Sequence, residues 1–237
     1  MRAWVGTSGY SYSEWKGSFY PEDLPAQRML RYYSERFRAV EINNTFYRMP
    51  TAKLLSQWSG QVPDGFHFAL KAPRRITHIQ RLKEADQLVA FLFETVRELG
   101  HKLGPVLFQL PPFLRQDLPR LEAFLTRLPE GERVAIEFRH RSWFEDRVYQ
   151  ALQSRDVALC VADGELEGEV PLVSTASWGY LRLRRVEYQD QALNGWADRI
   201  KSQRWDEVFV FFKHEDEATG PKLAARFVDL FGPPEPL

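Results

Sequence analysis

The sequence VEINNTFY, at residues 40–47, begins like a buried β-strand and ends in polar side chains. Val40 and Ile42 alternate with Glu41 and Asn43, so apolar and polar residues fall on opposite faces of an extended strand. Asn is depleted in strand interiors, which makes it unexpected at the end of a buried run. An acid followed by amides here predicts a polar site where the strand ends, at the mouth of a barrel.

Short apolar runs of this kind recur along the chain, and helical patterns follow nearly all of them. Each run is rich in Val, Ile, Leu, Phe or Tyr and is short enough for a buried strand. The runs lie at residues 3–6, 39–43, 66–71, 105–110, 133–138, 157–162, 179–184 and 207–212. Such strands pair in parallel through right-handed crossovers, and closing them predicts an α/β fold, a TIM-type (β/α)8 barrel.

One connection lacks a helical pattern. Residues 163–178, DGELEGEVPLVSTASW, show no 3.6-residue period, so we expect the sixth helix to be degenerate or replaced by a loop. No repeat or linker is visible, and we expect residues 1–237 to form a single barrel domain with a frayed tail at 232–237. The alternative is an open doubly wound sheet, but GTSGYS at residues 6–11 is not its Gly-rich phosphate turn.

The composition bears on several functional classes. The formal net charge of the chain is zero, so no overall charge attracts nucleic acid or anionic lipid. Cys160 is the only cysteine, which excludes an intrachain disulfide and a cysteine-rich zinc site. No stretch approaches the roughly 20 apolar residues of a membrane helix. The N-terminus lacks the apolar region of a signal peptide, so we expect a cytoplasmic protein with no membrane partner.

A ring of polar side chains is predicted at the carboxyl ends of the strands, where barrel enzymes place their active sites. With Glu41 and Asn43 facing inward, the corresponding face of the other strands carries a matching set. The set is Lys71, Gln109, Glu137, Arg139, Asp163, Arg182, Arg184 and Lys213. Five of the ring residues are Lys or Arg and three are Asp or Glu. This excess of cations favours a small anionic ligand.

The residue types suggest roles within this ring. Glu41 and Glu137 are the acid–base candidates, while amides orient the substrate and cations hold it. Barrels often bind phosphate near strands seven and eight, where Arg182, Arg184 and Lys213 fall. We expect a cation or amide of the ring to bond Glu41 and lower its pKa, and Lys71 on the next strand is the nearest candidate. The alternative is an ion-pair plug that joins Glu137 to Arg139 or Arg182. Asn44 is expected to tie down the turn after the second strand.

The loop after the first strand is crowded with aromatic residues. Tyr10 and Trp15 belong to the segment SGYSYSEWKGSFYP at residues 8–21 and are candidates for stacking on a base or sugar. The alternative is a lid packed by its own side chains.

Metal and nucleophile chemistry have weaker signals. The histidines are scattered, and the best metal candidate pairs Glu137 with His140, so no metal or cofactor is predicted. His140 is expected instead to cap or pack within its own loop. Ser8 follows the first strand and is a candidate nucleophile, but the sequence around it lacks the nucleophile-elbow motif that would support this role.

Several segments resemble the successive motifs of the YecE-like family, also called domain of unknown function seventy-two. They are GTSGYSYSEWKGSFYP, VEINNTFYRMP, FALKAP with TH, GPVLFQLPP, IEFRHRSW and YLRLR, in order over residues 5–231. The resemblance implies a TIM-type barrel and no established activity. Two departures, RLRR at 182–185 in place of Leu-His-Gly and FFKHED at 211–216 in place of paired asparagines, add cationic character to the phosphate side.

These observations predict an enzyme of the hydrolase or isomerase type that acts on a small anionic or phosphorylated substrate. One alternative is a metal-dependent nucleic-acid-processing barrel resembling apurinic endonucleases, which the zero net charge does not favour. The other is a non-catalytic module that binds a small ligand with the same ring.

Overall fold

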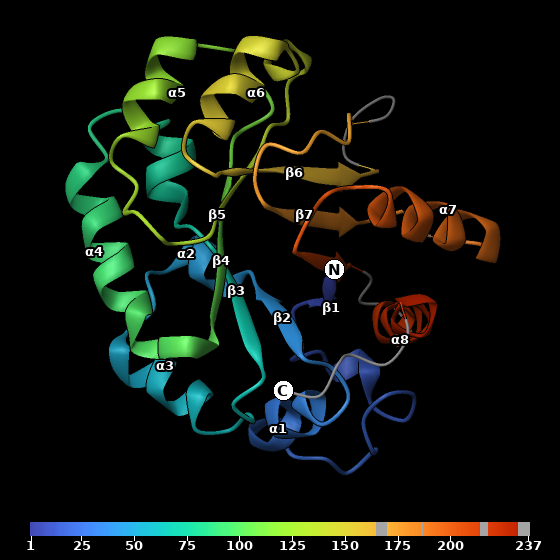
Figure 1. The fold of residues 1–237 in the computed structure, drawn as a ribbon. Helices are drawn as coiled ribbons and strands as arrows, with labels where there is room; N and C mark the ends of the chain where they lie inside the picture. The colour runs from blue at the N-terminus through green and yellow to red at the C-terminus, as the bar shows by residue number, and fades with distance from the viewer. Residues whose placement is uncertain (165–169, 186, 214–217, 232–237) are drawn as a thin grey trace.

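The strands form one closed parallel barrel in the order β1 to β8 (Figure 1). The computed structural model describes residues 1–164, 170–185, 187–213 and 218–231. The strands are β1 Arg2–Ser8, β2 Ala39–Ile42, β3 His67–Lys71, β4 Leu103–Gln109, β5 Val134–Glu137, β6 Ala158–Asp163, β7 Trp178–Leu183 and β8 Glu207–Phe212. The barrel closes where β8 pairs with β1, placing Trp4 opposite Phe209. The predicted TIM-type barrel is confirmed.

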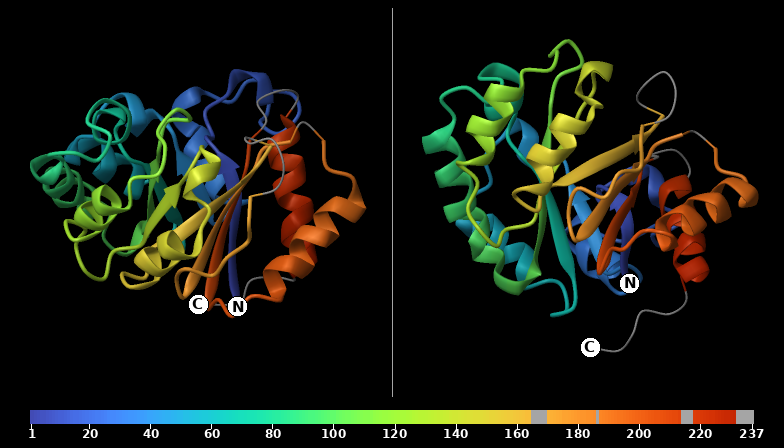
Figure 2. Two further views of the ribbon diagram at one scale, coloured as in Figure 1. Left: turned by 90° about the horizontal axis from the view of Figure 1, so that it is seen from above. Right: turned by 45° about the horizontal axis from the view of Figure 1, so that its top comes forward.

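Helices surround the barrel as an outer layer (Figures 1 and 2). The α-helices are α1 Met29–Ser34, α2 Asn44–Tyr47, α3 Ala52–Ser59, α4 Asp86–Val96, α5 Leu118–Leu125, α6 Asp146–Gln153, α7 Asp190–Lys201 and α8 Thr219–Phe231. Short helical turns are η1 Ser13–Trp15, η2 Ala26–Arg28, η3 Arg75–Ile79, η4 Arg97–Lys102 and η5 Arg141–Trp143. None of the helices in the described ranges is long and apolar enough to cross a membrane.

Local side chains explain where several helices begin. The Thr51 hydroxyl accepts a hydrogen bond from Leu54 N at 3.3 Å and starts α3. The Asp117 carboxylate accepts one from Arg120 N at 3.1 Å and starts α5. Both are N-cap interactions that satisfy backbone donors which the helix itself leaves unpaired.

The connection between β6 and β7 is irregular where it is described. Residues 170–177 form no helix, in agreement with the prediction that the helix after the sixth strand is degenerate or replaced by a loop. Thr175 anchors this segment beside β6, because its hydroxyl donates to Val157 O at 2.8 Å and accepts from Leu159 N at 2.7 Å. The rest of that prediction, at 165–169, and the predicted frayed tail at 232–237 lie outside the described residues.

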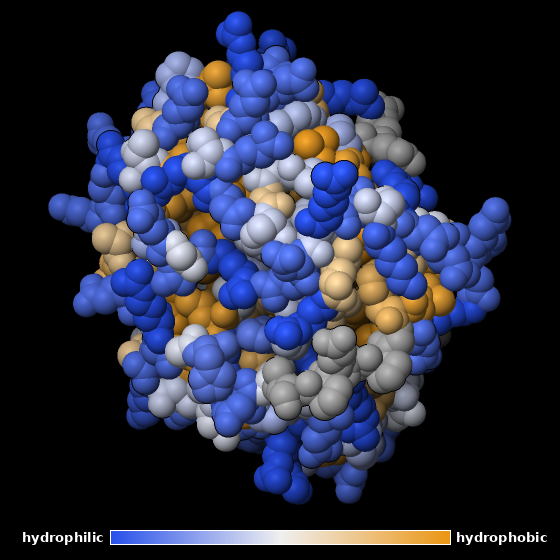
Figure 3. Space-filling model, in the orientation of Figure 1, coloured by the Kyte–Doolittle hydropathy of each residue, from blue (hydrophilic) through white to orange (hydrophobic). Residues whose placement is uncertain are grey.

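The barrel interior is filled unevenly by large and small side chains. Its buried cluster comprises Trp4, Ala39, Ala69, Leu107, Ala135, Ala158, Cys160, Trp178, Tyr180, Phe209 and Phe211. Aromatic rings from β1, β7 and β8 therefore face alanines on β2, β3, β5 and β6. A second, larger hydrophobic cluster lies between the strands and the helices. The face shown in Figure 3 is mostly hydrophilic, with hydrophobic atoms visible mainly in recesses.

Gly6 allows β1 and β2 to approach closely just below the polar end of the barrel. A Cβ at this position would lie 1.9 Å from Ala39 O and 2.8 Å from the Tyr33 hydroxyl. That hydroxyl donates to Ala39 O at 3.0 Å and accepts from Thr7 N at 2.8 Å. The absence of a side chain thus fixes the spacing of the two strands that carry Ser8 and Glu41.

Candidate functional site

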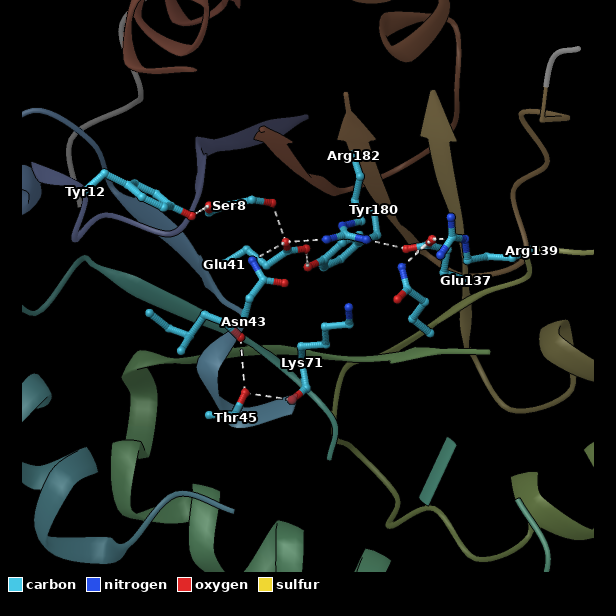
Figure 4. A network of polar contacts seen from close by, with 12 residues as sticks. Ser8, Tyr12, Glu41, Asn43, Thr45, Lys71, Glu137, Arg139, Tyr180 and Arg182 are labelled. Carbon is cyan, nitrogen blue, oxygen red and sulfur yellow. Dashed lines mark hydrogen bonds and ion pairs between the residues drawn. The ribbon is translucent and has the colours of Figure 1, made fainter. Parts of the chain in front are cut away.

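Two glutamates and one arginine form a buried network across the carboxyl end of the barrel (Figure 4). Arg182 Nη2 donates to Glu41 Oε1 at 2.9 Å, and Arg182 Nη1 donates to Glu137 Oε2 at 2.6 Å. None of the three side chains is more than 1% exposed. The prediction that Glu41 and Glu137 meet inside the barrel is confirmed. The pair of Glu137 with Arg182, one form of the alternative ion-pair plug, is present.

Glu41 is held as a carboxylate by donors from several strands. Ser8 Oγ, Tyr180 OH at 2.7 Å and Asn43 Nδ2 at 3.4 Å donate to it, in addition to Arg182. Burial opposes ionisation, but the Arg182 charge and these hydrogen bonds outweigh it and lower the pKa of Glu41 to about 2. The predicted fall in this pKa is therefore confirmed.

The prediction that a cation or amide of the ring bonds Glu41 is confirmed by Arg182 and Asn43, but the candidate named for this role, Lys71, is wrong. Lys71 forms no hydrogen bond with Glu41, and the cation comes from β7 across the barrel instead of from the neighbouring β3. The register explains the difference, because Glu41 lies opposite Ala69 and Lys71 is two residues further along β3. Lys71 therefore lies one pleat above the carboxylate.

Glu137 has fewer partners than Glu41. Gln109 Nε2 donates to its Oε1 at 2.7 Å, from the position opposite it on β4. Arg139 Nε lies 3.9 Å from the same oxygen. Burial again opposes ionisation, yet the Arg182 charge and the hydrogen bond from Gln109 lower the pKa of Glu137. Both carboxylates are thus charged at neutral pH and neither is a neutral general acid.

A half-buried layer of polar side chains lies above this network. It includes Asn43, Lys71, Arg139 and Arg184. Burial and the nearby charge of Arg182 lower the pKa of Lys71 to about 8, against the opposing effect of the two glutamates. The Lys71 Nζ lies 4.2 Å from the centre of the Phe46 ring. Among the described residues, none forms a hydrogen bond or ion pair with this Nζ.

Within the part of the chain that the structure describes, the two other cations predicted to bind an anion, Arg184 and Lys213, are not part of the hydrogen-bond network of Arg182 and the two glutamates. The charge of Arg184 contributes to the lowered pKa of Lys71 and acts on that of Cys160, so Arg184 lies near the mouth. Lys213 is half-buried and its backbone N–H donates to Leu183 O at 3.1 Å. The binding of an anion by Arg182, Arg184 and Lys213 stays a prediction.

Asp163 faces away from the barrel, and its predicted inward orientation is wrong. Ala162 is the residue opposite Arg182, so Asp163 belongs to the outer face of β6. Its carboxylate accepts from Arg185 Nε at 2.8 Å, Tyr188 OH at 2.9 Å and Trp196 Nε1 at 3.2 Å. A one-residue shift in phase moves a strand side chain to the opposite face. Without Asp163, the predicted ring has five cations and two anions.

The β1 loop supports the alternative interpretation of a lid packed by its own side chains. Trp15 is 1% exposed and its ring lies 4.8 Å from Tyr12 and 5.7 Å from Phe19, between ring centres. It therefore has no face open for stacking, and its predicted ligand contact is wrong. Tyr10 is half-buried and packs 6.3 Å from Tyr33. Tyr12 joins the loop to the site, because its hydroxyl donates to Ser8 O at 2.7 Å.

Glu137 and His140 do not converge. His140 Nδ1 accepts from Ser142 N at 3.2 Å and caps η5, as the sequence indicated, while Glu137 points into the barrel. In the described part of the chain, no group of three or more His, Cys, Asp and Glu side chains could hold a metal ion.

Sequence reasoning missed residues that shape the site. Tyr180 precedes Arg182 by two residues and shares its face, a signal hidden by the expectation that aromatic residues fill the core. Thr45 performs the role predicted for Asn44, since its hydroxyl lies 2.7 Å from Lys71 O and 3.1 Å from Ile42 O. Asn44 instead begins α2 with an exposed side chain.

The loop after β3, which follows Lys71, has an unusual backbone. η3 is a π-helical turn, and Arg81, Leu82 and Glu84 have positive φ angles of 51°, 67° and 47°. Such conformations are costly for residues other than Gly and occur often at functional sites.

A cavity of about 1090 Å³ lies at the opposite, amino-terminal end of the barrel. Its lining includes Arg2, Val134, Trp178 and Glu207, which stand where their strands begin. In barrel enzymes this end contributes to stability and the carboxyl end carries the chemistry, so the polar mouth is the stronger candidate site.

Comparison with known proteins places the chain in a family. The family described as "Protein of unknown function DUF72" matches residues 4–236. The chain belongs to the DUF72 family. UPF0759 protein YecE of Escherichia coli strain K12 is 31% identical over 140 residues, which cover 56% of this chain and 52% of YecE. The match thus spans about half the length of that relative. UPF0759 protein YunF of Bacillus subtilis strain 168 is 27% identical over 229 residues, covering 90% of this chain and 79% of YunF.

Solved structures agree with the DUF72 assignment and with the barrel. A DUF72 protein from Thermotoga maritima MSB8 has a TM-score of 0.84 at 27% identity, covering 98% of this chain and 100% of the other. D-psicose 3-epimerase from Clostridium cellulolyticum H10 has a TM-score of 0.60 at 11% identity, with 97% of each chain covered. The second likeness shows the barrel fold alone.

Proposed function

We propose that this DUF72 protein is an enzyme of the hydrolase or isomerase type that acts on a small anionic or phosphorylated substrate at the carboxyl mouth of the barrel. The observation that carries the proposal is Lys71, a half-buried cation without an anionic partner among the described residues. Charged side chains are rarely covered unless they are paired. A bound anion would supply the missing partner.

The buried network and the layer above it divide the expected roles. Glu41 is saturated with donors, so it orients Arg182 and Ser8. Glu137 Oε1 has one close donor, Gln109, and is the better placed proton acceptor. Asn43 and Gln109 orient the substrate, while Lys71, Arg139, Arg184 and Lys213 attract its anionic group. Both carboxylates are covered, so the substrate reaches them when side chains of the upper layer shift.

The protonation of Lys71 favours an enzyme over a binding module. An acid or base works best when its pKa lies near the operating pH, and the pKa of Lys71 is lowered to about 8. A module that only bound anions would gain from a lysine that stays fully charged. The strained loop after β3 is a further feature typical of active sites.

Thermal shift with inorganic phosphate tests the binding part of this proposal. With a Kd of about 1 mM, about 10 mM phosphate stabilises the native state by about 1.4 kcal/mol. A protein of this size gains about 2–4 °C in melting temperature for each kcal/mol. Arg184→Gln should reduce the shift, whereas Arg2→Gln at the far end should not. A shift that Arg2→Gln abolishes and Arg184→Gln preserves would place the anion in the amino-terminal cavity and contradict the proposal.

Turnover is tested separately, with a panel of phosphorylated and carboxylated compounds. A compound that is converted by the native protein should be converted at least about 100-fold more slowly by Glu137→Gln, since general-base catalysis typically contributes that factor. Unchanged turnover in Glu137→Gln would exclude this residue as the proton acceptor.

A further inference from the structure

We propose that the Lys71 amine forms a Schiff base with the carbonyl group of an anionic ketone or aldehyde. The inference rests on the proposed function and names its substrate class. It assigns to Lys71 a covalent role that simple attraction of an anion would not require.

The position of Lys71 suits a nucleophile. It is the last residue of β3, and its side chain points toward the space between Glu41 and Glu137 (Figure 4). The Thr45 hydroxyl, 2.7 Å from Lys71 O, fixes the backbone from which the amine projects. The Phe46 ring, 4.2 Å from Nζ, covers one side of the amine. The amine is therefore held at the mouth on an ordered element.

A second buried lysine shows what an ordinary structural lysine looks like in this protein. Lys102 is 7% exposed, and its Nζ donates to Ser59 O and Val62 O, both at 2.9 Å. It also lies 3.4 Å from Asp64. Lys71 has no such acceptors among the residues with described positions. Its amine is therefore not committed to an oxygen atom of any residue that the structure describes.

The surrounding charges favour the uncharged amine. Burial and the charges of Arg182 and Arg184 lower the pKa of Lys71 to about 8. Near neutral pH, about a tenth of such amines are uncharged, which is roughly 300 times the fraction of an ordinary lysine. A lysine that is desolvated and lies beside other cations is an activated amine nucleophile. Glu41 and Glu137 oppose this effect only in part, because each is bound to Arg182.

The same surroundings select an anionic carbonyl compound. Arg139 and Arg184 are cations at the mouth, where an anionic group on the substrate would be attracted while the carbonyl carbon faces Nζ. The amine lone pair attacks that carbon, forming a carbon–nitrogen bond as the carbonyl π electrons move to oxygen. Both amine protons pass through solvent to this oxygen, which leaves as water, and a carbon–nitrogen double bond remains. No oxidant or reductant takes part.

Reductive trapping tests the inference with the full chain. Pyruvate is added as an anionic ketone and acetone as an uncharged one, each with cyanoborohydride, which reduces the imine to a stable secondary amine. Peptide mass spectrometry then locates the modified lysines. We expect the Lys71 peptide to be modified by pyruvate at least about tenfold more than the peptide that contains Lys53, an exposed lysine on α3, because a desolvated amine beside other cations is the better nucleophile. Acetone should label Lys71 much less than pyruvate does.

Lys71→Arg is the matched variant, because it keeps the positive charge and removes the nucleophile. It should lose the pyruvate adduct while it still unfolds cooperatively in a melting experiment. Labelling that follows exposure, with Lys53 modified more than Lys71, would overturn the inference. Equal labelling of Lys71 by acetone and pyruvate would overturn the selection of an anionic substrate.

The two proposals fail in distinguishable ways. A phosphate shift that depends on Arg184, without preferential modification of Lys71, would leave the proposed function standing and remove the Schiff base. Trace labelling with acetic anhydride gives a measurement that does not depend on the ketone. The rate at Lys71 should rise with pH to a midpoint near 8. A midpoint near the ordinary lysine value would overturn the inference.

Discussion

Replacing Lys71 with Met is predicted to stabilise the protein. At neutral pH the native state holds this lysine charged in a half-buried position, which lowers its pKa from the ordinary 10.5 to about 8. At about 1.36 kcal/mol for each pKa unit, the charge costs about 3 kcal/mol relative to the unfolded chain. Met preserves most of the side-chain volume and removes the charge. We expect a gain of about 2–3 kcal/mol, allowing for partial solvation of the amine.

Urea or thermal denaturation of both proteins measures this gain, which corresponds to about 5–10 °C in melting temperature for a chain of this length. Lys53→Met on α3 is the control, because Lys53 is exposed and its replacement should change stability by less than about 0.5 kcal/mol. Destabilisation by Lys71→Met would refute the reasoning, since it would show that the native state gains from the ammonium group.

The pH dependence gives this prediction a second signature. Between pH 8 and 10.5 the unfolded chain binds more protons at this lysine than the native state does. The free energy of unfolding of the native protein should therefore rise with pH through this window relative to that of Lys71→Met. The difference in stability between the two proteins should narrow accordingly. A gap that stays constant up to pH 10 would show that the difference does not come from the titration of Lys71.

Other substitutions test the rest of the structure. Glu41→Gln should lower the free energy of unfolding by about 3 kcal/mol at neutral pH, because Glu41 has a pKa of about 2 against an ordinary 4.5. The contribution of Glu41 is present above pH 4.5 and is lost as the pH falls toward 2. An acid-denaturation curve of the variant that matches that of the native protein would contradict this prediction. Asp163→Ala should lower the free energy of unfolding in urea by about 1–3 kcal/mol, because it removes contacts with α7. It should leave the phosphate-induced thermal shift unchanged, and loss of that shift would show that Asp163 takes part in anion binding. Gly6→Ala should yield little folded protein, because its Cβ would lie 1.9 Å from Ala39 O; an unchanged melting curve would refute that packing.

The barrel could be predicted because its signals repeat. Each strand is a short apolar run, and the connection whose helical pattern is missing, after β6, has no helix over residues 170–177. Period-two alternation also placed Glu41, Glu137 and Arg182 on the inner face correctly. Local patterns of this kind depend on backbone geometry, which neighbouring residues largely determine.

The partners within the site could not be predicted, because they depend on contacts across the barrel. The sequence suggests Lys71 for Glu41 because their strands are adjacent, whereas Arg182 reaches Glu41 from the opposite wall. Asp163 shows the limit of alternation, since a polar residue at a strand end is compatible with either face until the register is known. Trp15 shows that the aromatic side chains of a loop can pack against one another and leave no surface for a ligand.

The central claim is that Lys71, which has no anionic partner among the described residues, is an amine with a pKa of about 8 in an anion-binding mouth. Nuclear magnetic resonance of protein with carbon-13 at lysine Cε tests it directly, with the Lys71→Arg variant identifying the resonance. The account predicts that this one resonance titrates near pH 8 and that adding phosphate shifts it and raises its midpoint, because a bound anion favours the charged amine. A Lys71 resonance that titrates near 10.5 and ignores phosphate would contradict the account.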